Sequence, residues 1–119
     1  MIIKIDDLKY SIENLESVLS DIRNERSILT QQIEQNIVKV NESEKYISSI
    51  TEKEDEDARI FTPRNMENRY KTQLDDSKLI IESLNSMNRD LYRRRNAMDE
   101  KIDKLNSVLK ILNSILISK

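Results

Sequence analysis

Two clusters of charged residues carry the functional groups in this sequence that commonly bind ions or phosphates. Carboxylates gather just before the middle of the chain, where they offer oxygen ligands to a divalent cation. Guanidinium groups gather farther along, where they offer donors to phosphate or to an acidic protein. The acidic run contains Glu52, Glu54, Asp55, Glu56 and Asp57, and the basic run contains Arg89, Arg93, Arg94 and Arg95.

Neither run has the pattern of a specific binding site. The acidic run lacks the glycine and the ligand spacing of a calcium loop, so we interpret it as a solvated turn. The basic run has acids nearby, among them Asp90 and Asp99, so we interpret it as a solvated face with ion pairs. The chain has no histidine, cysteine or glycine, and therefore lacks imidazole bases, thiolates and phosphate-binding glycine loops. We expect a protein that is not an enzyme and uses no metal and no cofactor.

The composition is typical of long helices with polar faces rather than of a compact globule. Of the 119 residues, 37% are hydrophobic and 35% are charged, but only 4% are aromatic. The net charge of −2 disfavours nucleic acid as a partner. The acidic amino terminus and the short apolar stretches predict neither a signal peptide nor a membrane contact. We expect a cytoplasmic protein.

Apolar residues recur in alternating steps of three and four along both halves of the chain, and each such line of positions is called a seam below. The first seam contains Ile5, Leu8, Ile12, Leu15, Leu19, Ile22, Arg26, Leu29, Ile33, Asn36, Val40, Ser43, Ile47 and Ile50. The second seam contains Tyr70, Leu74, Ser77, Ile81, Leu84, Asn88, Leu91, Arg95, Met98, Ile102, Leu105, Leu109, Leu112 and Leu116. In each seam eleven of the fourteen positions are apolar, which predicts two long coiled-coil helices.

The only proline lies between the two seams and predicts a turn at the middle of the chain. Pro63 disfavours helical backbone angles at Thr62, which then caps a new helix that has Pro63 at its first position. We expect a first helix over about 3–56, a turn over about 57–62 and a second helix over about 63–117. Because long helices joined by a short turn usually fold back antiparallel, the prediction is an all-α helical hairpin that forms a single domain over 1–119.

Polar residues interrupt both seams at similar levels. Facing residues of an antiparallel hairpin have a constant sum of residue numbers. That sum is 120 for Ser43 with Ser77, 121 for Arg26 with Arg95, and 124 for Asn36 with Asn88. Because a buried polar residue costs stability and commonly fixes register or partner choice, we expect partner or switch positions at Arg26, Asn36, Asn88 and Arg95.

The turn offers three more candidate partner positions. Ile60 and Phe61 form an apolar pair that either seals the end of the hairpin or presents an exposed recognition knob. Arg59 precedes this pair and Arg64 follows it within a few residues, so their charges are close enough to neutralise part of the acidic run.

The carboxyl end of the second helix has more apolar surface than one partner helix can cover. Its aliphatic residues point all round the helix and include Val108, Leu109, Ile111, Leu112, Ile115 and Leu116. Each aliphatic side chain that leaves water contributes about 1.5–3 kcal/mol. Several of them together offset the roughly 4–15 kcal/mol lost on association. We therefore predict a homodimer that forms a four-helix bundle at least over this end, with these six residues in its interface.

Part of the sequence resembles the amino-terminal sensor domain of DegS-type histidine kinases, the cytoplasmic two-component sensors of low-GC Gram-positive bacteria. The resemblance lies in an R-x-F-[ST] element at 59–62, a tyrosine at Tyr70, and the run LYRRRNAMDEKIDKL at 91–105, which is similar to the family pattern L-R-x-R-R-D-x-L-E-x-R-L-x-x-L. Asn96 and Lys101 depart from it, where the family usually has an acid and an arginine. The resemblance implies a dimeric signal-input domain that passes a conformational change along its helices to a kinase core.

Two functions are therefore open. The first is a non-catalytic signal-input and dimerisation module of a two-component histidine kinase system, whose kinase core lies beyond Lys119 or in another chain. The second is a stand-alone coiled-coil adaptor or inhibitor that acts by occupying the surface of a protein partner. A histidine-containing helix encoded after Lys119 would distinguish the first from the second.

Overall fold

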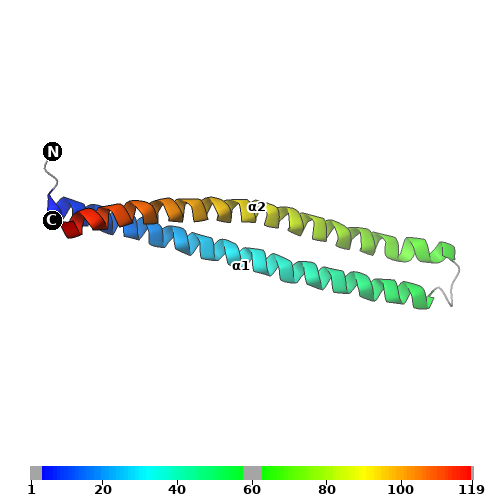
Figure 1. Ribbon diagram of the computed structural model, residues 1–119. Helices are drawn as coiled ribbons and strands as arrows, with labels where there is room; N and C mark the ends of the chain where they lie inside the picture. The colour runs from blue at the N-terminus through cyan, green and yellow to red at the C-terminus, as the bar shows by residue number, and fades with distance from the viewer. Residues whose placement is uncertain (1–3, 58–62, 119) are drawn as a thin grey trace. The chain divides into compact units, whose positions relative to one another are not determined.

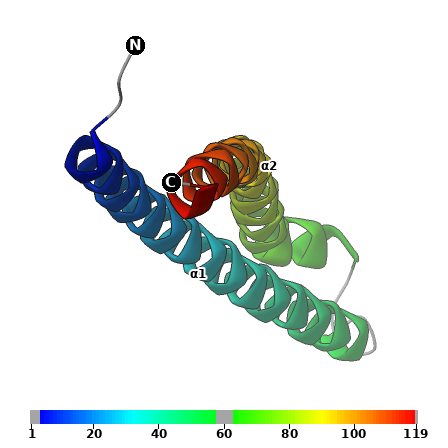
Figure 2. The same cartoon turned by 60° about the vertical axis from the view of Figure 1, so that its left-hand side comes forward.

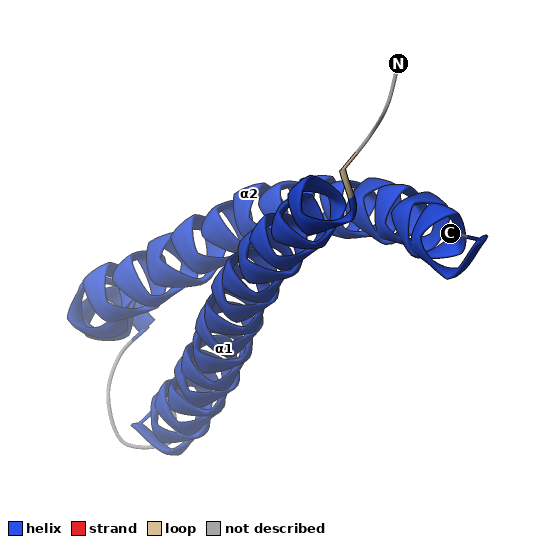
Figure 3. Cartoon of the chain, turned by 90° about the vertical axis from the view of Figure 1, so that its left-hand side faces the viewer, coloured by secondary structure: helices blue, strands red, loops and turns tan. Residues whose placement is uncertain are grey.

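The computed structural model describes residues 4–57 and 63–118, with side chains over 4–56 and 70–118. Helix α1 spans Ile5–Asp57 and helix α2 spans Pro63–Ser118 (Figure 1). The two helices pack antiparallel, which confirms the predicted all-α hairpin. Figure 2 shows each of them as one uninterrupted helix, and Figure 3 shows loop at Lys4, before α1 begins. Ile60, Phe61 and Thr62 lie outside the described residues, as does the side chain of Arg64.

The chain divides into two compact units, each made from one part of α1 and one part of α2. The terminal unit contains Met1–Gln31 and Tyr92–Lys119, and the middle unit contains Gln32–Leu91. In the terminal unit the first half of α1 lies beside the second half of α2, blue beside red in Figure 1. In the middle unit the remaining parts of the two helices lie beside each other, joined by the segment between them.

The core of the terminal unit is a continuous set of aliphatic seam residues. Leu8, Ile12 and Leu19 of α1 are buried together with Leu109 of α2. Partly buried side chains surround them and include Leu15, Ile102, Leu105, Leu112, Ile115 and Leu116. Because these residues repeat in steps of three and four, each helix buries one stripe and leaves its other faces in water.

The core of the middle unit mixes aliphatic and polar seam residues. Its buried apolar residues are Ile33, Val40, Ile50, Tyr70 and Leu91, of which Ile33 has only 2% of its surface exposed. Its buried polar residues are Asn36, Ser77 and Asn88. These polar side chains make this core less apolar than that of the terminal unit, where the buried residues are all aliphatic.

The predicted seams agree with the observed burial along both helices. All fourteen seam positions of α2 are buried or half-buried, and so are thirteen of the fourteen in α1. The exception is Ile5, which is 45% exposed. Ile5 is the first residue of α1, and in an antiparallel pair it faces the last residues of α2, where little of the partner helix remains to cover it.

Candidate interaction sites

The two seam asparagines form a hydrogen-bonded pair inside the middle unit. The Nδ2 group of Asn36 donates to Oδ1 of Asn88 over 2.9 Å, and Nδ2 of Asn88 donates to the backbone carbonyl of Ile33 over 3.4 Å. Both side chains are buried, so a shift of either helix would leave amide groups without partners in the core. The predicted pairing of Asn36 with Asn88 is therefore confirmed, and it fixes the register of this unit.

Each of the two seam arginines of the terminal unit donates a side-chain hydrogen bond to a residue directly opposite it on the other helix. The Nε group of Arg26 donates to a carboxylate oxygen of Asp99, and Nη1 of Arg95 donates to Oγ1 of Thr30 over 3.4 Å. These contacts follow nearly the same register as the asparagine pair. They place Arg26 and Arg95 in neighbouring layers, so the expected pairing of these two arginines at one level is wrong.

Arg95 also contacts an aromatic ring on its own helix. Its guanidinium carbon lies 4.9 Å from the centre of the Tyr92 ring, within range of a cation–π interaction. Sequence reasoning did not assign this role to Tyr92. The spacing of three residues on one helix would have indicated it, because such residues lie on the same face.

An open hollow of about 410 Å³ lies beside the Arg26 ion pair. It is lined by Arg23, Arg26, Ser27, Thr30, Asp99 and Ile102. The side chains of Arg26 and Asp99 remain 40% and 43% exposed, so water screens their charges. We infer that the ion pair contributes no more than about 1 kcal/mol to stability.

We predict that replacing both seam arginines with leucine raises the melting temperature. Arg26→Leu with Arg95→Leu would extend the aliphatic seam, and each leucine buried there contributes up to about 1.5–3 kcal/mol. The lost ion pair is worth less, so the midpoint of thermal unfolding followed by circular dichroism should rise by roughly 5–10 °C at fixed protein concentration. Arg93→Leu, on an exposed face, is the control and should leave the midpoint nearly unchanged. A lower midpoint for the double variant would show that the arginines stabilise the hairpin.

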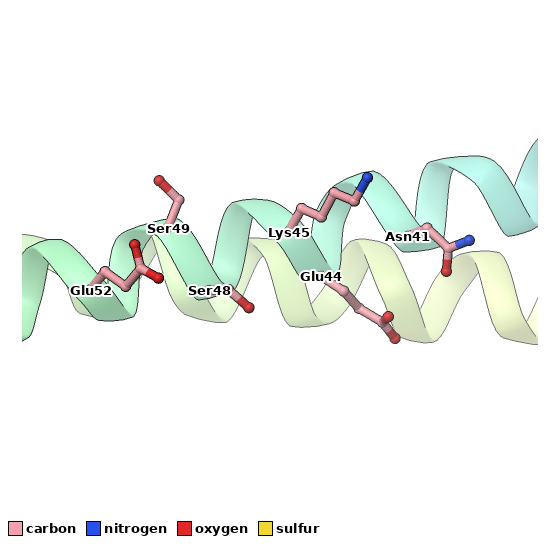
Figure 4. A pocket seen from close by; sticks show the side chains of 6 residues that line it. All are labelled: Asn41, Glu44, Lys45, Ser48, Ser49 and Glu52. Atoms are coloured by element: carbon pink, nitrogen blue, oxygen red, sulfur yellow. The ribbon is translucent and has the colours of Figure 1, made fainter.

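Two further hollows lie on the middle unit and are open to solvent. The larger, of about 450 Å³, lies along one face of α1 (Figure 4). It is lined by Asn41, Glu44, Lys45, Ser48, Ser49 and Glu52, all exposed. The smaller, of about 300 Å³, lies between the helices, beside Tyr46 and Tyr70. The carboxylates, amines and hydroxyls in these linings belong mostly to exposed residues that water solvates.

Most members of the two charged runs are exposed on the helices, whereas Glu54 and Arg95 are half-buried. Glu52, Asp55 and Glu56 are exposed near the end of α1, and Arg89 and Arg93 are exposed on α2. Among the residues that the structure describes, no group of three or more carboxylates is placed to hold a metal ion. The predicted solvated turn is therefore wrong in one respect: the acidic run is solvated but belongs to the last turns of α1, because the helix continues to Asp57. In the basic run Arg95 is half-buried, because it lies in the seam.

Large apolar residues outside the seams are exposed on both units. In the terminal unit they include Tyr10, Val18, Ile28, Val108, Ile111 and Ile117. In the middle unit they include Ile37, Val38, Tyr46, Leu79, Ile80 and Met87. Where several such residues follow one another along one face of a helix, they mark a candidate contact surface for another protein chain.

The six residues predicted for the dimer interface fall into two groups. Leu109 is buried, and Leu112, Ile115 and Leu116 pack against the core of their own hairpin. Val108 is 43% exposed and Ile111 is 61% exposed. Only Val108 and Ile111 of the six are therefore exposed to a second chain, and the interface itself stays a prediction.

No protein-family model, curated protein or solved structure matches this chain. The resemblance to DegS-type sensor domains accordingly stays a prediction from the sequence. Within the described ranges, neither helix contains a segment long and apolar enough to cross a membrane.

Proposed function

We propose that this protein is a non-catalytic helical hairpin that works by protein association, forming a homodimer through apolar side chains outside its own seams. The observation that carries this proposal is the exposure of aliphatic residues on the terminal unit, above all Val18, Ile28, Val108 and Ile111. Association would remove these side chains from water, at about 25 cal/mol per Å² of apolar surface. Two hairpins that pack along this surface form a four-helix bundle.

The biological role that we propose for the dimer is signal input to a two-component histidine kinase. The resemblance of 59–105 to DegS-type sensor domains supports this role, and the polar seam layers are consistent with it. The layers of Arg26 and Arg95 are weaker than an aliphatic layer, so the helices can repack there at a lower cost in free energy. A change of packing in one layer is then transmitted along the two stiff helices to the kinase core that they contact.

Reading the gene beyond codon 119 tests the signalling role. A histidine-containing helix and an ATP-binding domain, either in the same frame or in a chain that copurifies with this one, would support it. A stop codon with no kinase among the copurifying chains would contradict it, while leaving the dimer proposal intact.

We predict that acidic substitutions on the exposed aliphatic residues weaken the dimer. Val108→Asp with Ile111→Asp would place two charges in the apolar contact, so the dissociation constant should rise at least about tenfold. Both side chains are exposed in the single hairpin, so its helix content should not change. Sedimentation velocity gives the association, and far-ultraviolet circular dichroism gives the helix content.

The matched control is Asn106→Asp with Asn113→Asp. This variant adds the same charge to exposed positions of the same part of α2, but on the polar side of the seam. It should keep the dissociation constant of the parent protein. Equal weakening by both double variants would mean that charge alone, rather than the loss of an apolar contact, controls association.

A second candidate function is a stand-alone adaptor or inhibitor that binds a protein partner. The exposed residues Tyr46, Ile80 and Met87 of the middle unit favour it, because they form an apolar surface of their own. A homodimer that buries only the terminal unit would leave that surface available to a partner helix.

A further inference from the structure

Each helix of the terminal unit carries a second line of residues in steps of three and four, parallel to its seam. On α1 this line contains Asp7, Ser11, Asn14, Val18, Asp21, Glu25 and Ile28, all of them exposed. On α2 it contains Arg94, Ala97, Lys101, Lys104, Val108, Ile111, Ile115 and Ser118, of which only Ile115 is half-buried. The charged residues in the α1 line are all acidic, and those in the α2 line are all basic.

The two second lines lie on the same flank of the terminal unit. The hollow beside Arg26 shows that Arg23 and Thr30 of α1 share a flank with Asp99 of α2. In a paired antiparallel coiled coil the positions on the other side of the two seams then share the opposite flank. That opposite flank, called the aliphatic flank below, carries Val18, Ile28, Val108 and Ile111, whereas the lining of the hollow is polar except for Ile102.

A second copy that packs on the aliphatic flank has two symmetric orientations. If the two-fold axis runs across the helices, α1 meets α1 and α2 meets α2, so acids face acids and bases face bases. If the axis runs along the helices, α1 of each copy meets α2 of the other, so acids face bases. Opposite charges attract and like charges repel across such an interface, so complementarity favours the axis along the helices.

The levels of individual residues agree with this orientation. A rotation about an axis along the helices does not shift residues along that axis. The α2 residue of the second copy that faces a given α1 residue therefore has the same number as the α2 residue opposite it in its own hairpin. Arg26 with Asp99 and Thr30 with Arg95 fix that level. Asp21 then faces Lys104 of the second copy. Glu25 and Val18 lie within one residue of the levels of its Lys101 and Val108.

We infer that two copies of this chain associate side by side in the same direction, with α1 of each copy against α2 of the other along the aliphatic flank of the terminal unit. This inference rests on the proposed homodimer and gives it an orientation, in which the central turns of both hairpins point the same way. Aliphatic contacts supply the affinity, and the two acid–base pairs on each side select the orientation.

Charge reversal at Asp21 and Lys104 tests the orientation. These two residues lie farther from their own seam than Glu25 and Lys101, and the described part of the chain gives neither of them an ion pair within its own hairpin. We expect Asp21→Lys alone, and Lys104→Glu alone, each to weaken the dimer roughly tenfold at low salt, because each replaces two attractive pairs with two repulsive pairs. The double variant should recover the dissociation constant of the parent, measured by sedimentation equilibrium.

Three outcomes would overturn the inference. A dimer whose dissociation constant changes little in all three variants would reject this orientation while keeping the homodimer. Tighter association of the single variants would favour the orientation in which like helices meet. A parent protein that sediments as a monomer would reject the homodimer itself, which separates failure of the proposed function from failure of the orientation.

Discussion

Ile33→Ala should lower the free energy of unfolding by about 2–5 kcal/mol. Ile33 has 2% of its surface exposed and lies beside the asparagine layer of the middle unit. Removing three carbon atoms from a closely packed seam loses their transfer free energy and leaves a cavity that two stiff helices cannot close. Urea unfolding followed by circular dichroism, at one fixed protein concentration, gives the difference.

The matched control for this substitution is Val38→Ala. Val38 lies five residues farther along the same helix, is 54% exposed and is β-branched like Ile33. Alanine has the higher helix propensity, so this variant should unfold within about 0.5 kcal/mol of the parent. If Val38→Ala destabilised the protein as much as Ile33→Ala, the seam assignment in this part of α1 would be wrong.

The asparagine pair should show strong coupling between its two members. Asn88→Leu alone removes the acceptor of the Asn36 amide and leaves a buried polar group unpaired, at a cost of about 1–3 kcal/mol. Asn36→Leu with Asn88→Leu removes both polar groups and fills the layer with aliphatic atoms. The double variant should therefore be at least as stable as the parent, and more stable than either single variant by about 2 kcal/mol.

The double asparagine variant should lose its preference for a single register between the two helices. Without the hydrogen bond, a shift by one heptad still matches aliphatic residues, so alternative registers become accessible. Additive effects of the two single substitutions in denaturant unfolding would contradict direct contact between the side chains.

The sequence was sufficient to predict the hairpin, because three independent signals agree. The seams predict two helices, Pro63 coincides with the first residue of α2, and Asn36 with Asn88 predicts the observed register. The pairing of Arg26 with Arg95 predicts a different register, which the contacts of those arginines contradict. Heptad spacing is a local property of the chain, and it determines which face of each helix is buried. For the same reason the burial of Leu8, Leu19 and Leu109 could be read from spacing alone.

Other features could not be predicted, because they depend on how long side chains bend across the seam. Asp99 is one of several acids that lie near the seam arginines, and only the packed helices select it as the partner of Arg26. The contact of Arg95 with Thr30 and Tyr92 likewise depends on rotamers that heptad spacing does not determine. Heptad spacing overestimates the apolar surface that the carboxyl end offers to a second chain. Leu109 is buried in its own hairpin, and Ile115 is already half-buried there. Spacing assigns a residue to a face but does not measure how much of it the partner helix covers.

The mass of the unmodified protein in solution tests the proposed self-association most directly. Sedimentation equilibrium at micromolar concentration should give twice the chain mass of 14.1 kDa, with the monomer appearing only on dilution. A mass of 14.1 kDa that does not change with concentration would contradict it, because the aliphatic flank of the terminal unit would then remain in water without a second copy.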